Sequence, residues 1–232
     1  MPTYGETWTY ESIVGALPGI DLSAGQAIAI QVALFEAAVL VFAWYYDLWA
    51  LAVAGTVAVA VAALGSAEML RIGAMIRQSE PPSAYRRLLF GSSIEVVLSV
   101  LAFVGLVSYL LRSAPGTSFA LVFSPDAPLP VLYLALLILW DLCYRIGTGW
   151  WASIVGLWRS VRYQFDPEDA ASLRRADAET VLFGLTQLLL VPFVLEHPLL
   201  VGVLLGHVLA VTIVSGISIL LLSRRMHAIA SV

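Results

Sequence analysis

The stretch that decides the fold is LLILWDLCYRIGTGWW, residues 136–151. It lies in an apolar run long enough to cross a bilayer, yet it carries Asp141 and Arg145 one helical turn apart. A charged side chain at the centre of a membrane helix costs roughly 2.5–3.5 kcal/mol on insertion scales, and such residues mark ion pathways and proton relays. Two of them in one helix make this stretch the first candidate for a functional site.

The composition excludes an ordinary soluble domain. Of the 232 residues, 60% are hydrophobic and 12% are charged, and the mean hydropathy is +0.91. A soluble globular domain has about 25% charged residues, so this chain has too little polar surface to face water on all sides. The formal charge of −4 gives no support for nucleic-acid binding, and the partner that the composition implies is the lipid bilayer.

Six apolar segments have the length of about 20 residues that a spanning helix needs. The connections between them are short, so we predict an all-α bundle of six transmembrane helices, forming one domain over residues 23–225. An acidic segment, 1–22, precedes this domain, with a short interfacial helix as one option for residues 8–17, and a tail, 226–232, follows it. The predicted spans are 23–46, 48–72, 88–111, 130–157, 179–196 and 198–222.

Helix-start residues agree with these boundaries. Ser23 is a capping residue before the first span, and Ser83 follows two prolines before the third. Asp166 followed by Pro167 predicts that the fifth helix begins in water, about a dozen residues before its apolar block, because this pair is typical of a helix start. Pro192 is expected to kink the same helix near its far end.

The arginines predict the orientation. Ten of the 12 basic residues, all of which are Arg, flank the second and fourth connections or follow the last span. Cytoplasmic loops carry the excess of Arg and Lys, so this side is predicted to be cytoplasmic and the protein to lie in the cell (inner) membrane. Six spans then place both termini in the cytoplasm.

The charged and polar residues of the spans are predicted to form a ladder across the membrane. Depths follow from a rise of about 1.5 Å per helical residue, and they group these residues into four levels. From the outer to the inner side, the levels are Glu36 with His207, Asp141 near the midplane, Arg145 with Glu95, and the inner-interface pair Glu68 with Arg71.

Small residues predict two helix-packing faces. Gly202 and Gly206 form a GxxxG pattern just before His207, and Gly147 and Gly149 follow Arg145. Small residues at this spacing let two membrane helices approach closely. The face of Gly202 and Gly206 can serve packing inside the bundle, a homo-oligomer or another membrane partner.

No enzyme class, metal or cofactor is predicted. The chain has no Lys, which excludes a retinal or pyridoxal Schiff base, and it has no HExxH motif and no Walker motif. The Gly-x-Ser-Gly nucleophile motif of rhomboid proteases is absent, since the fourth span reads Gly147-Thr148-Gly149. The single cysteine, Cys143, is a poor metal site on its own.

Two functions remain open. The leading hypothesis is a small transporter or channel for protons, cations or a small solute, in which Asp141, Glu95, Glu36 and His207 bind or relay and Arg145 tunes the site. The alternative is a non-catalytic scaffold or subunit of a membrane complex, in which Asp141 and Arg145 neutralise each other and hold the helices together.

Overall fold

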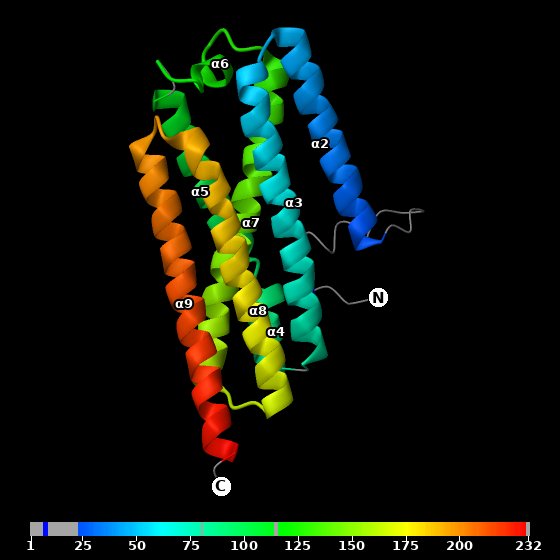
Figure 1. The fold of residues 1–232 in the computed structure, drawn as a ribbon, viewed down its shortest axis with the longest axis vertical. Coiled ribbons are helices and arrows are strands. Elements are labelled where there is room, and N and C mark those ends of the chain that lie inside the picture. The colour runs from blue at the N-terminus through cyan, green and yellow to red at the C-terminus, as the bar shows by residue number, and fades with distance from the viewer. Residues whose placement is uncertain (1–6, 9–22, 80, 114–115, 231–232) are drawn as a thin grey trace.

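The structure is a computed structural model that describes residues 7–8, 23–79, 81–113 and 116–230, with side chains as far as Arg224. The described residues form helices and no strand (Figure 1). Six helices, counted over these ranges, are long and apolar enough to cross a membrane, so the chain is a multi-pass membrane protein whose apolar helices contact lipid. The all-α, six-span prediction is confirmed.

The helices run up and down in chain order, and two spans are divided into two pieces. The third span consists of α4 and α5, and the fifth consists of α8 and the 3₁₀-helix η1. The elements are α2 (Ala24–Tyr46), α3 (Trp49–Gln78), α4 (Ser83–Phe90), α5 (Ile94–Ser113), the short α6 (Ala120–Phe123), α7 (Leu129–Arg162), α8 (Pro167–Thr186), η1 (Gln187–Val194) and α9 (Pro198–Ala230).

The predicted helix starts are formed as expected. The Ser23 hydroxyl accepts from the backbone N–H of Gln26, and the Gln26 side chain accepts from the backbone N–H of Ser23. This reciprocal capping satisfies two N–H groups that have no partner inside the helix. Asp166 has extended backbone angles and Pro167 is the first residue of α8, so the fifth helix begins where the sequence indicated.

The third span is broken, which the sequence analysis did not predict. A continuous helix was expected over 88–111, but α4 ends at Phe90 and α5 begins at Ile94. The intervening residues are Gly91, Ser92 and Ser93, and Ser93 has a φ of 55°, outside the right-handed helical region. Glycine and serine favour the helix less than alanine or leucine does, and three of them in a row end α4.

The fifth span changes helix type before its proline. The α-helix α8 passes into η1 at Gln187, five residues ahead of Pro192. Proline has no N–H to donate and its ring clashes with the carbonyl four residues earlier, which for Pro192 is that of Leu188. The irregularity expected at Pro192 therefore extends back over more than one turn.

The helix α7 is the centre of the bundle, since it packs against α3, α5, α8 and α9 and touches α2. Figure 1 shows α2 at one edge of the bundle and α9 at the other. The main neighbour of α2 is α3, so α2 is the most peripheral of the spans.

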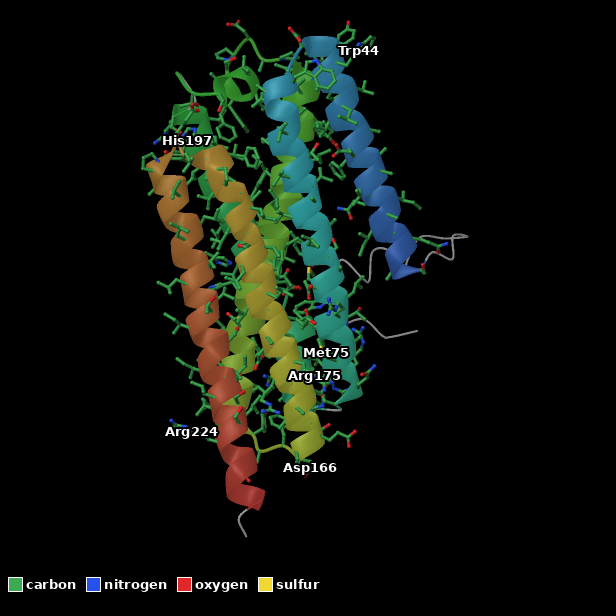
Figure 2. All side chains as sticks on the ribbon, in the orientation of Figure 1. Trp44, Met75, Asp166, Arg175, His197 and Arg224 are labelled. Atoms are coloured by element: carbon green, nitrogen blue, oxygen red, sulfur yellow. The ribbon has the colours of Figure 1, made fainter. Side chains whose placement is uncertain are left out.

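The two ends of the bundle differ in chemistry. Figure 2 shows Trp44 and His197 at one end, here called the aromatic end, and Asp166, Arg175 and Arg224 towards the other, here called the arginine-rich end. The 34 residues of α7 extend about 51 Å at 1.5 Å per residue, whereas the hydrocarbon core is about 30 Å thick. The 23 residues of α2 extend only about 35 Å, so the longer helices continue beyond α2 at the arginine-rich end.

The chain ends and α9 differ in part from what the sequence predicted. Residues 9–17 of the proposed interfacial helix lie outside the described residues, and Trp8 is fully buried in the bundle. The expected tail begins as a continuation of α9, which runs to Ala230. A Cβ built at Gly202 or Gly206 meets nothing within 4 Å in the described part of the chain. Of the alternatives given for this face, packing inside the bundle is thus not formed among the described residues, because α9 turns its opposite face, with Val208 and Val211, to its neighbours.

Candidate functional site

The candidate site centres on Asp141, which has two partners. Its Oδ1 accepts from the Arg145 guanidinium at 2.8 Å, and its Oδ2 accepts from Gln31 Nε2 of α2 at 2.8 Å. The Arg145 side chain is 0% exposed, whereas that of Asp141 is 17% exposed. The carboxylate is thus the member of the ion pair that is open to its surroundings.

The Arg145 side chain is tightly packed between helices. Its guanidinium contacts the Met69 sulfur of α3 at 3.7 Å and lies 5.4 Å from the centre of the Tyr144 ring. Gly65 of α3 makes room for it, because a Cβ at that position would lie 3.0 Å from Arg145 Cβ and within 2.7 Å of the Phe183 ring. The three helices α3, α7 and α8 can meet at Arg145 only because residue 65 has no side chain.

A small cavity adjoins Asp141 between α2, α3 and α7. Its volume of about 10 Å³ is the space that one water molecule needs. The lining residues are Gln31, Val32, Phe35, Val59, Ala62, Ala63, Ile138 and Asp141. Two of these, Gln31 and Asp141, offer the polar groups that a bound water requires.

The position of Asp141 along the bundle axis can be compared with α2 through its partner Gln31. Gln31 is seven residues from Ala24 and fifteen from Tyr46, or about 10 Å and 22 Å along the helix axis. Relative to α2, Asp141 therefore lies in the half nearer the arginine-rich end.

A second polar cluster joins α3 to α8. Arg71 donates to Glu68 at 3.2 Å and to Glu179 at 2.6 Å, so the predicted pair of Glu68 and Arg71 lies in contact and gains a third member. The carboxyl groups of Glu68 and Glu179 are thus joined through one arginine. The Arg71 side chain is 59% exposed, which gives the cluster contact with its surroundings.

Glu36 and His207 do not form a common level. Glu36 accepts a hydrogen bond from Thr56 Oγ1 of α3 at 2.6 Å, and it belongs to α2. His207 belongs to α9, at the opposite edge of the bundle in Figure 1, where its ring lies 5.9 Å from that of Trp150. Their expected pairing is therefore wrong, because depth along an axis says nothing about which helices are neighbours.

Glu95 lies where α5 meets α7. Its side chain is fully buried, and its backbone oxygen would lie 3.2 Å from a Cβ built at Gly147. The same Cβ would meet the backbone and hydroxyl of Ser99, so Gly147 lets the two helices approach, as predicted. A Cβ built at Gly149 would lie 3.3 Å from the Phe183 ring.

The largest buried polar network was missed by the sequence analysis. Arg159 donates to Asp177 at 2.6 Å and to the Tyr85 hydroxyl at 3.0 Å. Ser218 donates to the same Asp177 oxygen and contacts Ser160, each at 2.6 Å. This network, called the Arg159 network below, joins α4, α7, α8 and α9. Asp177 lies in the part of the fifth helix that was predicted to precede the apolar block, and no residue pattern pointed to Arg159 as its partner.

A second histidine environment lies at the aromatic end. His197 is fully buried, with the rings of Tyr109 and Phe119 at 5.7 Å and 5.2 Å. The adjacent Glu196 accepts from the backbone N–H and the hydroxyl of Ser118. These hydrogen bonds, the backbone one first, lower the pKa of the Glu196 carboxyl below its ordinary value. The turn between η1 and α9 is thereby tied to the loop before α6.

Metal-binding geometry is absent from the described ranges, where no three His, Cys, Asp or Glu side chains come together. Cys143 is a buried free thiol. The polar groups at the Asp141 site are its own carboxylate, the Gln31 amide and the Arg145 guanidinium, and of these the carboxylate is the group that can take up and release a proton.

Comparison with known proteins identifies a family but no activity. No curated protein and no solved structure matches the chain. One protein family does match, over residues 3–218, and it is described as a family of unknown function, DUF7530. This match covers the six spans as far as the middle of α9. The chain therefore belongs to the DUF7530 family.

Proposed function

We propose that the protein moves protons across the membrane along the side of the bundle formed by α2, α3, α7 and α8. The observation that carries this proposal is the carboxylate of Asp141, held by Arg145 and Gln31 beside a cavity of one-water size. A carboxylate inside a membrane protein that water can reach is able to accept and release a proton. Asp141 is the central proton-binding group.

The cluster of Glu68, Arg71 and Glu179 supplies the next group towards the arginine-rich end. Gly65 lies level with Arg145, and Glu68 follows three residues later, which is about 4.5 Å along α3. Arg71, which is 59% exposed, contacts the carboxyl groups of both Glu68 and Glu179. Carboxyl groups beside an exposed arginine can exchange a proton with water at the membrane surface.

Glu36 supplies the group on the other side of Asp141. It lies five residues beyond Gln31 on α2, or about 7.5 Å along the axis, and it shares its proton-binding oxygen with Thr56. Along the bundle axis the carboxyl groups thus lie in the order Glu36, Asp141 and Glu68, with axial steps of about 7.5 Å and about 10.5 Å, and water molecules would complete the path between them. His207 belongs to another part of the bundle and has no place in this path.

Protons fit this site better than larger solutes. The space beside Asp141 holds about one water molecule, and the neighbouring positions are filled by Val59, Ala62 and Ile138. A hydrated cation or an organic solute would need these side chains to move apart. A proton needs only the carboxylate and the water.

The second candidate function is a scaffold within a membrane complex. The exposed face of Gly202 and Gly206 on α9 favours it, because small residues on an open helix face allow another helix to pack there. In that case Asp141 and Arg145 are a structural ion pair.

Proton flux into liposomes separates the two functions. Purified protein is reconstituted with a pH-sensitive dye inside the vesicles, and a potassium gradient with valinomycin drives proton entry. We expect flux from the wild type, and flux at the level of protein-free vesicles from Asp141→Asn. Asp126→Asn, an exposed carboxylate between α6 and α7, is the matched control and should conduct normally.

A second variant separates a loss of conduction from a loss of folding. Gln31→Leu removes one hydrogen bond to Asp141 and leaves the ion pair, so it should fold and conduct at a reduced rate. If the wild type does not conduct, and Asp141→Asn lowers the thermal stability alone, the proton pathway is wrong and the ion pair is structural.

A further inference from the structure

The two halves of α2 are attached to the bundle differently. Its buried residues are Val39 and Ala43, both in the half nearer the aromatic end, and no residue of 24–38 is buried. The aromatic-end half is tightly packed, because a Cβ at Gly55 of α3 would lie 3.1 Å from the Val39 side chain. Towards its first residue, α2 diverges from α3 (Figure 1). Residues 24–34, here called the free half of α2, are thus loosely packed.

A hydrogen bond from Gln31 ties the free half to the centre of the bundle. Gln31 Nε2 donates to Asp141 Oδ2 of α7 at 2.8 Å. A second hydrogen bond joins α2 to the bundle, from Thr56 of α3 to Glu36 at 2.6 Å, but it lies beyond the free half towards the aromatic end. The position of the free half therefore depends on the bond between Gln31 and Asp141.

The free half is also a wall of the Asp141 cavity. Gln31 and Val32 line this cavity from α2, whereas Ala62 and Ile138 line it from α3 and α7. The volume of about 10 Å³ is what one water molecule needs. A movement of the free half away from α7 would enlarge this space and open the Asp141 carboxylate to more water.

The strength of the tie depends on the charge of Asp141. A hydrogen bond to an ionised group is roughly twice as strong as one between neutral groups, so proton uptake by Asp141 weakens its bond to Gln31. The spans around the site carry other charged or titratable groups, namely Glu36, Glu68, Glu95, Arg145, Glu179 and His207. Of these, Arg145 is the one bonded to Asp141, and it lies on the same helix, so it does not hold α2.

We propose that Gln31 is a positioning residue that latches the free half of α2 onto ionised Asp141, and that proton uptake by Asp141 releases this half and opens the site. The inference rests on the proposed proton pathway for the role of Asp141 and on the contacts of Gln31 for the latch. The proton binds a carboxylate oxygen of Asp141, and no covalent bond breaks. The short turn at Asp47, with a φ of 55°, joins α2 to α3 at the aromatic end and is the pivot.

Distances between two spin labels, measured by double electron–electron resonance, test the latch without requiring transport. In a Cys143→Ala background, one label is attached to Ala29→Cys on the free half and the other to Gln164→Cys beyond α7; both native side chains are exposed. As the pH of the lipid nanodiscs is lowered, we expect a second, longer distance to appear. Its population relative to the first should rise about tenfold, which is the size expected for the loss of one hydrogen bond to a charged group.

Three variants assign the movement to the latch. Gln31→Leu removes the hydrogen bond and should show the longer distance at every pH, a loss of pH response that a merely structural residue would not cause. Asp141→Asn carries no charge and should behave in the same way. Thr56→Val is the matched control, because it removes the other hydrogen bond of α2 and should keep the distances and pH response of the wild type. The pH response of the labelled wild type supplies the test if Gln31→Leu or Asp141→Asn fails to fold.

The outcomes separate this inference from the proposed function. A distance that does not change with pH in the labelled wild type overturns the latch, whatever the flux, and so does a pH response that persists in folded Gln31→Leu. An equal change in Thr56→Val also overturns it, because α2 would then be loosely held along its whole length. A pH response that Gln31→Leu and Asp141→Asn abolish, without proton flux from the wild type, supports the latch and overturns the proton pathway. The same response together with flux that Asp141→Asn abolishes supports both.

Discussion

Arg159 and Asp177 form an ion pair of 2.6 Å in which both side chains are almost fully buried. The pair joins α7 to α8, and Tyr85 and Ser218 bring α4 and α9 to the same point. Gly156 makes the approach possible, because a Cβ there would lie 2.8 Å from the Asp177 carboxylate. Four helices are thus fastened at the arginine-rich end by one network.

Removal of either charge from this network should destabilise the protein strongly. Breaking a buried ion pair costs about 3–5 kcal/mol, because the remaining charge stays buried without a partner. We expect a loss of this size for Arg159→Ala and for Asp177→Asn, measured by thermal and denaturant unfolding in detergent. Arg162→Ala, an exposed arginine near the end of α7, is the control and should change the stability by less than about 0.5 kcal/mol. A small effect at Arg159 would show that the network is not what fastens these helices.

Alanine substitutions of the glycines should have two different effects on the stability of the protein, according to the space around each glycine. Gly147→Ala places a methyl group against Ser99 and the backbone of Glu95, and overpacking of this kind costs typically about 1–3 kcal/mol. Gly202→Ala and Gly206→Ala add a methyl group in open space, so they should be neutral or slightly stabilising. Unfolding in detergent measures both. Equal losses at Gly147 and Gly202 would contradict the packing described here.

The same two α9 variants also test the open face. If Gly202→Ala leaves the stability of the monomer unchanged but alters the size of the particle in size-exclusion chromatography with light scattering, the face binds a second copy. An unchanged particle size would remove the self-association form of the scaffold hypothesis.

The sequence was sufficient for the fold because hydrophobic length is a strong signal in membrane helices. Ser23, and Asp166 with Pro167, indicated the helix starts, since capping and first-turn proline are local effects. The break at 91–93 was missed because a glycine and two serines are common inside membrane helices, and their effect depends on the packing of α4 against α7.

The site was predicted only in part, because the sequence gives the depth of a residue along its helix but not which neighbouring helix its side chain faces. Asp141 with Arg145 and Glu68 with Arg71 were found because partners three or four residues apart share one helix face. Gln31, Glu179 and Asp177 reach their partners from other helices, and the angular position of those helices follows from tertiary packing. The Glu36 and His207 pairing failed for the same reason.

The tie between Glu196 and Ser118 should be visible in a pH titration. Hydrogen bonds from Ser118 lower the pKa of Glu196 below its ordinary value of 4.5. A carboxyl with a lowered pKa in the folded state adds stability above its ordinary pKa, and this stability is lost as the pH falls through the lowered value. Ser118→Ala removes the hydroxyl but leaves the backbone N–H, so the pKa should return part of the way.

Carbon-13 NMR of labelled glutamate carboxyl groups follows this titration directly. The Glu196 signal, assigned with Glu196→Gln, should titrate at higher pH in Ser118→Ala than in the wild type. Ser124→Ala, a nearby serine outside this contact, should leave the signal unchanged. A Glu196 pKa that is unmoved by Ser118→Ala would show that the backbone N–H alone holds the carboxylate.

The orientation of the bundle should follow its arginines. Flanking arginines are retained on the cytoplasmic side of a membrane, so the arginine-rich end should face the cytoplasm and the aromatic end the exterior. Two reporter cysteines are introduced separately in a Cys143→Ala background. Gln164→Cys lies between α7 and α8 at the arginine-rich end, and Asp126→Cys lies before α7 at the aromatic end. Both native side chains are exposed. An impermeant maleimide added to intact cells should label the Asp126→Cys variant and spare the Gln164→Cys variant until the cells are opened. The reverse pattern would place the exposed Arg71 and its two carboxyl partners outside, and the proposed direction of the proton path would reverse with it.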